Sequence, residues 1–240
     1  LTSVTPTGDG VFSYRWYEGT AVDPNAAIPV LTFAALPSSN SETWNPGILA
    51  EDRWYVREVT STLNGVQCVE NTDTVWVRVN NLDPGSIVTA AYTICDGASM
   101  TDIDATAAVA DGLVAYMWQS SSDGTNFSDT GVTTEDYAAT AITADTWFRR
   151  MATSTVTSPV NLSCTEYTGT IKVTVINFVP GAISSDQTIC LGSAPLAFTS
   201  VAASGDGVKT YQWQDSTATS GVWANVPSGG TSATYSAGVL

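Results

Sequence analysis

The sequence predicts an all-β fold built from tandem repeats, and three observations support that prediction. Short segments rich in threonine, valine, isoleucine and aromatic residues alternate with turn residues along the whole chain. Several motifs recur with a period of about 95 residues, which is the size of one small β domain. No long segment carries the apolar stripe of an amphipathic helix.

The recurring motifs define three repeats. The markers are Tyr14-Arg15-Trp16 with Tyr116-Met117-Trp118 and Tyr211-Gln212-Trp213, Thr93-Ile94-Cys95 with Thr188-Ile189-Cys190, Trp54-Tyr55-Val56-Arg57 with Trp147-Phe148-Arg149-Arg150, and Cys68 with Cys164. We predict a first repeat over 1–82, a complete middle repeat over 83–178 and a third repeat over 179–240. By this alignment the first repeat lacks its opening strand and the third lacks its closing strands. We therefore expect the chain to be an excerpt from a longer array.

Each repeat is predicted to be a set of short strands. In the middle repeat we expect strands at 114–119, 136–142, 146–153 and 171–175, with turns at 111–112 and 122–124. In the matching strand of the first repeat, over 75–79, a period of two places Val75, Val77 and Val79 on the core face and Trp76 and Arg78 on the outward face. About seven short strands with a central tryptophan favour an immunoglobulin-like sandwich.

Composition and charge exclude several classes of function. The 240 residues include Lys+Arg 8 and Asp+Glu 23, a net charge of -15, which argues against nucleic acid as a partner. No apolar run approaches the roughly 18 to 20 residues that cross a bilayer. The absence of histidine excludes Ser-His-Asp, Cys-His and histidine-zinc chemistry. Since no carboxylate pair stands in a distinctive motif, we predict that the chain is not an enzyme.

The four cysteines occupy two positions of the repeat. We expect Cys95 to pair with Cys164 inside the middle repeat, and Cys68 and Cys190 to pair with residues outside the fragment. The alternative is four reduced, buried cysteines. One disulfide in each repeat would indicate an oxidising compartment, and hence an extracellular or cell-surface location.

The combination of motifs resembles the immunoglobulin-like repeats of giant secreted and cell-surface proteins of Bacteroidota. The resemblance rests on Thr-Ile-Cys-x-Gly, Tyr-x-Trp-Gln, Thr-Trp-Phe-Arg-Arg and a late cysteine before Thr-Ile-Lys-Val-Thr-Val, and it extends over the whole chain. Such proteins carry type IX sorting or gliding-motility-associated domains and include adhesins and filaments. The resemblance implies a spacer or adhesive module without catalytic residues. It also implies O-glycosylation motifs, which here would modify Thr74 and Ser216, unless these are unmodified strand or turn residues.

Comparison of the repeats separates structural from candidate binding residues. Trp16, Trp118 and Trp213 share one position, and Trp54 and Trp147 share another, so we expect all five in the core. Trp76 aligns with Lys172, and Tyr17 aligns with Gln119 and Gln214, so these two are the candidate ligand contacts. The alternative for both is a shielded aromatic at a joint between repeats. Arg57 and Arg150 share a position that favours a structural cation–π or carboxylate contact.

No cofactor is expected, although calcium at a repeat junction is an alternative. Asp102, Asp104, Asp111 and Asp123 are the carboxylates that could contribute to such a site, and solvated loop charge is the other interpretation. The leading hypothesis is a stalk or filament segment of a large exported surface protein. Its partners would be neighbouring repeats and identical chains in a fibre. The alternatives are a module that binds glycans or a host surface, and accessory domains of a secreted enzyme.

Overall fold

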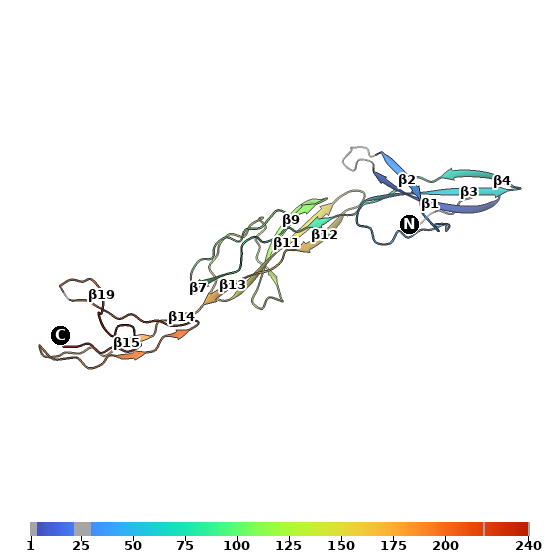
Figure 1. The fold of residues 1–240 in the computed structure, drawn as a ribbon. Helices are drawn as coiled ribbons and strands as arrows, with labels where there is room; N and C mark the ends of the chain where they lie inside the picture. The colour runs from blue at the N-terminus through green and yellow to red at the C-terminus, as the bar shows by residue number, and fades with distance from the viewer. Residues whose placement is uncertain (1–3, 22–29, 218, 240) are drawn as a thin grey trace. The chain divides into compact units, whose positions relative to one another are not determined.

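The computed structural model describes residues 4–21, 30–217 and 219–239 and is all-β, with no helix in that part of the chain. Figure 1 shows these residues as strands joined by loops. They form two compact units, which we describe separately. The first unit lies within 1–85, 107–116 and 151–167, and the second lies within 86–106, 117–150 and 168–240. The described part of the chain holds no helix that could cross a bilayer.

The first repeat forms a five-stranded antiparallel sheet in the order β2-β1-β3-β4, with β5 also paired to β3. Its strands are β1 (Val11–Ala21), β2 (Leu31–Ala35), β3 (Arg53–Leu63), β4 (Val66–Asn71) and β5 (Val75–Val77). Asn64 and Gly65 join β3 to β4, with φ of 51° and 79° respectively. Positive φ at both positions suits the two-residue hairpin turn that Asn-Gly favours.

The middle repeat forms a six-stranded sheet in the order β10-β9-β11-β13-β7, with β12 also paired to β11. Its strands are β6 (Leu82–Asp83), β7 (Tyr92–Cys95), β8 (Val109–Ala110), β9 (Leu113–Ser121), β10 (Ser128–Asp129), β11 (Thr146–Val156), β12 (Leu162–Tyr167) and β13 (Ile171–Ile176). Strand β7 runs parallel to β13, whereas β10 pairs antiparallel with β9, and both β12 and β13 pair antiparallel with β11. Strands β6 and β8 form a separate two-stranded sheet.

The third repeat carries three two-stranded sheets among its described residues, β14-β17, β15-β16 and β18-β19. Their bounds are β14 (Phe178–Val179), β15 (Ala182–Ser184), β16 (Thr199–Val201), β17 (Ser204–Gly205), β18 (Gln214–Asp215) and β19 (Ala224–Asn225). A groove of about 490 Å³ lies beside Trp213. Trp213 is half-buried, whereas Trp118 at the same repeat position is fully buried.

A buried apolar cluster forms the core around Trp118. Its members are Met100, Ile103, Ala105, Trp118, Tyr137, Phe148, Ile171 and Val173. The alternation predicted for 171–175 is confirmed, because Ile171, Val173 and Val175 are buried in β13. At the matching position of the first repeat, Val75 remains 44% exposed. Strand β13 has a neighbour on each side, whereas among the described residues β5 pairs only with β3.

The strand predicted at 136–142 is replaced by two isolated bridges, Tyr137 to Ile103 and Ala141 to Ser99. The physical reason is competition from side chains for the main-chain donors. The amide of Ala139 donates to the Asp102 carboxylate at 2.7 Å, which takes the place of a ladder hydrogen bond.

One hydrogen bond of the central tryptophan occurs in all three repeats. The indole N–H donates to a loop carbonyl, from Trp16 to Ser41 at 3.0 Å, from Trp118 to Thr134 at 3.1 Å, and from Trp213 to Ser232 at 2.9 Å. A buried indole needs such an acceptor, so this bond ties the loop to the central strand. Trp16 and Trp118 are buried, as the sequence predicted.

Candidate functional site

Arg57 and Arg150, which share a repeat position, are buried and hold loops in place. Arg150 is 0% exposed and donates to the carbonyl oxygens of Glu135 at 2.8 Å and Thr106 at 2.5 Å. Arg57 donates to the carbonyl of Glu42 at 2.9 Å. The Arg57 guanidinium also lies 5.1 Å from the centre of the Tyr14 ring, which confirms the predicted cation–π contact.

The outward face of the first-repeat sheet carries Trp76 and Trp54, directly opposite one another on β5 and β3. Their rings are parallel within 2° with centres 5.9 Å apart. Both side chains are half-buried, so the prediction that Trp54 lies in the core is wrong. On β3 the buried positions are 55 and 57, and a period of two therefore turns Trp54 outward.

Asp52 fixes the edge of this aromatic pair. One carboxylate oxygen accepts the Trp76 indole N–H at 3.1 Å, and the other accepts the Val79 amide at 2.8 Å. The Arg78 guanidinium lies 5.7 Å from the centre of the Trp76 ring. Both oxygens of Asp52 are thus engaged by N–H donors, and Trp76 is held in one orientation.

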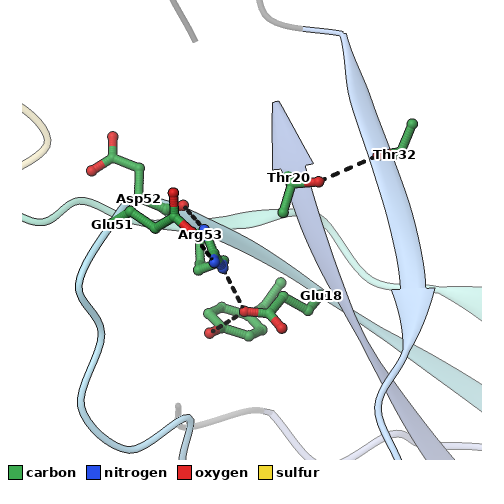
Figure 2. A network of polar contacts seen from close by, with 7 residues as sticks. Glu18, Thr20, Thr32, Glu51, Asp52 and Arg53 are labelled. Carbon is green, nitrogen blue, oxygen red and sulfur yellow. Dashed lines mark hydrogen bonds and ion pairs between the residues drawn. The ribbon is translucent and has the colours of Figure 1, made fainter. Parts of the chain in front are cut away.

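A polar network closes the same end of the sheet. Figure 2 shows Arg53 between Glu51 and Glu18, and Thr20 beside Thr32 across β1 and β2. The Arg53 hydrogen bond lowers the pKa of Glu51. Burial, followed by the Glu18 charge, raises the pKa of Tyr55, whose hydroxyl donates to Glu18 at 3.3 Å.

The corresponding face of the middle repeat is capped by cations. Lys172 stands where the first repeat has Trp76, and its ammonium lies 4.6 Å from the centre of the Trp147 ring. The Lys172 ammonium is also 2.7 Å from the Asp145 carboxylate. That hydrogen bond and the Val175 amide lower the pKa of Asp145. Trp147 is half-buried on this face, so the core position predicted for it is also wrong.

A second cation covers the next position of that face. The Arg149 guanidinium lies 4.1 Å from the centre of the Phe127 ring, and its Nε donates to Gln119 at 2.8 Å. Gln119 in turn donates to Asp129 at 2.7 Å. The first repeat has Tyr17 at the Gln119 position. The Tyr17 hydroxyl donates to Glu58 at 3.1 Å, and the side chain is half-buried.

The four cysteines are free thiols, so the expected Cys95–Cys164 disulfide is not formed. The strand register gives the physical reason. Cys164 pairs with Ser154 in the last part of β11. Cys95 on β7 lies opposite Ile176 on β13. Ile176 is three residues beyond Val173, which lies opposite Thr146, the first residue of β11. The two cysteines are thus eleven strand positions apart along the sheet, more than about 30 Å. A disulfide requires Cα atoms within about 7 Å.

The reduced, buried alternative does not hold either. Cys68, Cys95 and Cys190 are exposed, and Cys164 is half-buried. The two candidate glycosylation residues, Thr74 and Ser216, are both exposed.

The four aspartates considered for calcium do not converge. Among the described residues no group of three or more cysteine, aspartate or glutamate side chains could hold a metal ion. Instead, Asp102 accepts the Ala139 amide, and Asp111 binds Asn81. Asp123 accepts hydrogen bonds from the backbone and side chain of Asn126 and from the Thr125 amide, and these lower the pKa of Asp123. Asp104 is exposed.

The joint between the first and middle repeats contains a two-point contact that the sequence reasoning missed. The Asp111 carboxylate accepts the Asn81 amide at 2.8 Å and its side-chain N–H at 2.9 Å. The Asp111 amide donates back to the Asn81 carbonyl at 3.1 Å. We call this the Asn–Asp clasp. The signal was available, because Asp-Gly recurs at 9, 111 and 206.

The same clasp recurs between the middle and third repeats. The Asp206 carboxylate accepts the Asn177 amide at 3.1 Å and its side-chain N–H at 3.4 Å, and the Asp206 amide donates to the Asn177 carbonyl at 2.8 Å. Each clasp is extended by a short strand pair, β6-β8 in one case and β14-β17 in the other. The residues after each asparagine are therefore paired rather than free.

Two further side chains reinforce the first joint. Arg78 donates to the carbonyls of Ser158 at 3.0 Å and Asp111 at 3.1 Å. The buried Asn80 donates to the Ser154 carbonyl at 2.9 Å and accepts the Ser154 hydroxyl at 2.6 Å. Arg78 thus connects the Trp76 ring to the joint.

The protein is all-β. Its candidate functional features are the aromatic and charged residues on the outward sheet faces and the hydrogen bonds at the joints between repeats. A family model described as Domain of unknown function (DUF8696) matches residues 84–176 and again residues 179–240. These two matches cover more than half of the chain, so the chain belongs to that family.

No curated protein matches the chain. A solved structure, the crystal structure of human CDH23 EC21-23, is similar with a TM-score of 0.29 and 15% identity over 82% of this chain and 74% of that chain. At this TM-score the likeness carries no argument about fold or function.

Proposed function

We propose that the chain is a spacer segment of a large exported cell-surface protein, built from tandem immunoglobulin-like sandwiches. The observation that carries the proposal is the Asn–Asp clasp at both joints, Asn81 with Asp111 and Asn177 with Asp206. A spacer must transmit position from one module to the next, and a paired joint leaves few residues free to hinge. The two separate matches of one family model are consistent with a tandem array.

The contacts of two buried arginines inside the repeats also support a structural role. Arg57 and Arg150 each fix loops through main-chain carbonyls, a contact that does not depend on the loop side chains. The type IX secretion route and a Bacteroidota source remain part of the proposal, and they rest on the sequence resemblance.

Hydrogen exchange tests the joint. In wild-type protein we expect slow exchange at the amides of Asn81 and Asp111, because each donates within the clasp. Asp111→Ala should speed exchange across 78–85 and leave 176–180 unchanged, and Asp206→Ala should do the reverse. Fast exchange at both joints in wild-type protein would remove the support for a spacer.

Surface labelling tests the location. Antibodies raised against residues 1–240 should bind intact producing cells, and protease treatment of those cells should abolish the signal. Labelling that requires lysis of the cells would contradict an exported surface protein.

A further inference from the structure

The outward face of the first repeat holds an aromatic row in a single register across four strands. Phe33 on β2 lies opposite Gly19 on β1, Gly19 lies opposite Trp54 on β3, and Trp54 lies opposite Trp76 on β5. We call Phe33, Gly19, Trp54 and Trp76 the aromatic row. Tyr17 lies two positions along β1 from Gly19, on the same face.

Gly19 makes the row continuous. A Cβ atom at this position would lie 2.6 Å from the Phe33 ring, so the ring covers β1 at the point where a side chain is missing. Phe33 is 41% exposed, and Trp54 and Trp76 are half-buried. The row therefore presents ring surface to solvent on a strand scaffold rather than on loops.

The middle repeat provides an internal reference for this face. There the Trp147 ring is covered by Lys172, and the Phe127 ring is covered by Arg149. Those aromatic surfaces are occupied by the chain's own cations. In the first repeat the Lys172 position is Trp76 and the Arg149 position is Val56, so the face gains ring area and loses those two cations. The cation that stays beside it is Arg78, whose guanidinium lies farther away, 5.7 Å from the centre of the Trp76 ring.

The surroundings of the row define the chemistry of its ligand. Its rim carries carboxylates, Asp52 beside Trp76 and Glu58 beside Tyr17, in a chain of net charge -15. A negatively charged ligand would be repelled. The two N–H donors on Asp52 offset part of the negative charge that would attract a cation, while each carboxylate oxygen keeps acceptor capacity for a hydroxyl donor. What remains is an uncharged ligand with a flat apolar face and hydroxyl donors around its edge.

We propose that the aromatic row is a binding platform for a neutral glycan chain of equatorially linked hexopyranose units. The axial C–H faces of such sugars stack on aromatic rings, and their equatorial hydroxyls point outward to the carboxylate rim. Tyr17 is a rim contact, while Phe33, Trp54 and Trp76 provide the stacking surface. This function goes beyond the spacer role and does not depend on it.

Affinity electrophoresis of the full 1–240 chain tests the platform. The neutral β-linked probe is hydroxyethylcellulose, dextran is the α-linked comparison, and polygalacturonate is the anionic one. We expect retardation by hydroxyethylcellulose, weaker retardation by dextran and none by polygalacturonate.

The variants exploit the internal reference. Trp76→Lys installs the residue that the middle repeat carries beside its own tryptophan and aspartate, so the sheet should remain folded while affinity falls about tenfold or more. Phe33→Ala should lower affinity by a similar factor. Trp147→Ala, in the middle repeat, is the control and should leave affinity unchanged.

Near-ultraviolet circular dichroism confirms that each variant is folded. Absence of binding to hydroxyethylcellulose would overturn the proposal. So would binding that Phe33→Ala and Trp76→Lys leave intact, or preferential binding of polygalacturonate.

Discussion

The outward faces of the first and middle repeats share one skeleton and differ in how it is covered. In both, an aspartate accepts a valine amide at 2.8 Å, Asp52 from Val79 and Asp145 from Val175. In both, a tryptophan follows two residues after the aspartate, Trp54 in the first repeat and Trp147 in the middle repeat. The first repeat then adds Trp76, whereas the middle repeat adds Lys172. The comparison separates positions that hold the fold, which are the same in both repeats, from positions that are free to acquire a surface function.

The largest expected effect comes from the buried arginine that the two repeats share on the core side of the sheet. Arg150→Met removes the donor to the Glu135 and Thr106 carbonyls in a fully buried place. We expect a loss of about 3 to 5 kcal/mol in the free energy of unfolding. Urea denaturation followed by circular dichroism measures it. A loss below that of the matched variant Arg57→Met, whose side chain is slightly less buried, would break the equivalence of the two arginines.

An intermediate effect is expected at Gly19, where the Phe33 ring leaves no room for a side chain. Gly19→Ala places a methyl group against the Phe33 ring, and the ring must move. We expect a destabilisation of about 1 kcal/mol, because a flexible side chain rather than backbone yields. The measurement is the shift of the urea midpoint. Gly19→Ala combined with Phe33→Ala is the control, since removal of the ring should abolish the penalty.

The smallest effect concerns the Lys172–Asp145 ion pair, which the middle repeat has where the first repeat has the Trp54–Trp76 pair. Lys172 and the Val175 amide lower the pKa of Asp145 in the folded state. A lowered folded pKa contributes stability at pH values above about 4, the ordinary carboxyl pKa, and that stability is lost as the pH falls through the folded pKa. Melting temperatures of wild-type and Asp145→Asn protein should therefore converge between pH 5 and strongly acidic pH. Parallel curves would show that the pair contributes nothing.

The sequence predicted the all-β class and the alternation in β13, because those features follow from local residue patterns. The prediction that Trp54 and Trp147 lie in the core is wrong, because recurrence of a residue in each repeat does not indicate burial: outward positions recur as well. The Cys95–Cys164 disulfide failed for a related reason. Sequence spacing shows that two cysteines belong to one repeat, but only strand register shows that they lie at opposite ends of β11.

The aromatic row was partly visible from the sequence. Trp76 and Tyr17 were identified because they differ from their counterparts, and both lie on the outward face. Phe33 and Gly19 could not be identified, because their role depends on the pairing of β2 with β1 and of β1 with β3. The Asn–Asp clasp required the same kind of information, since its two residues are 30 positions apart.

The reinforced joint has a consequence for how the chain unfolds. Residues 107–116 and 151–167 belong by sequence to the middle repeat, yet they group with the first repeat in one compact unit. In tandem-repeat proteins, nearest-neighbour coupling makes stability a sum over modules and interfaces. Both compact units contain more residues than any one sequence repeat, so the smallest cooperative step is then larger than a repeat in either unit. A pulling experiment that released chain in steps of one sequence repeat would be reporting joints that had already opened.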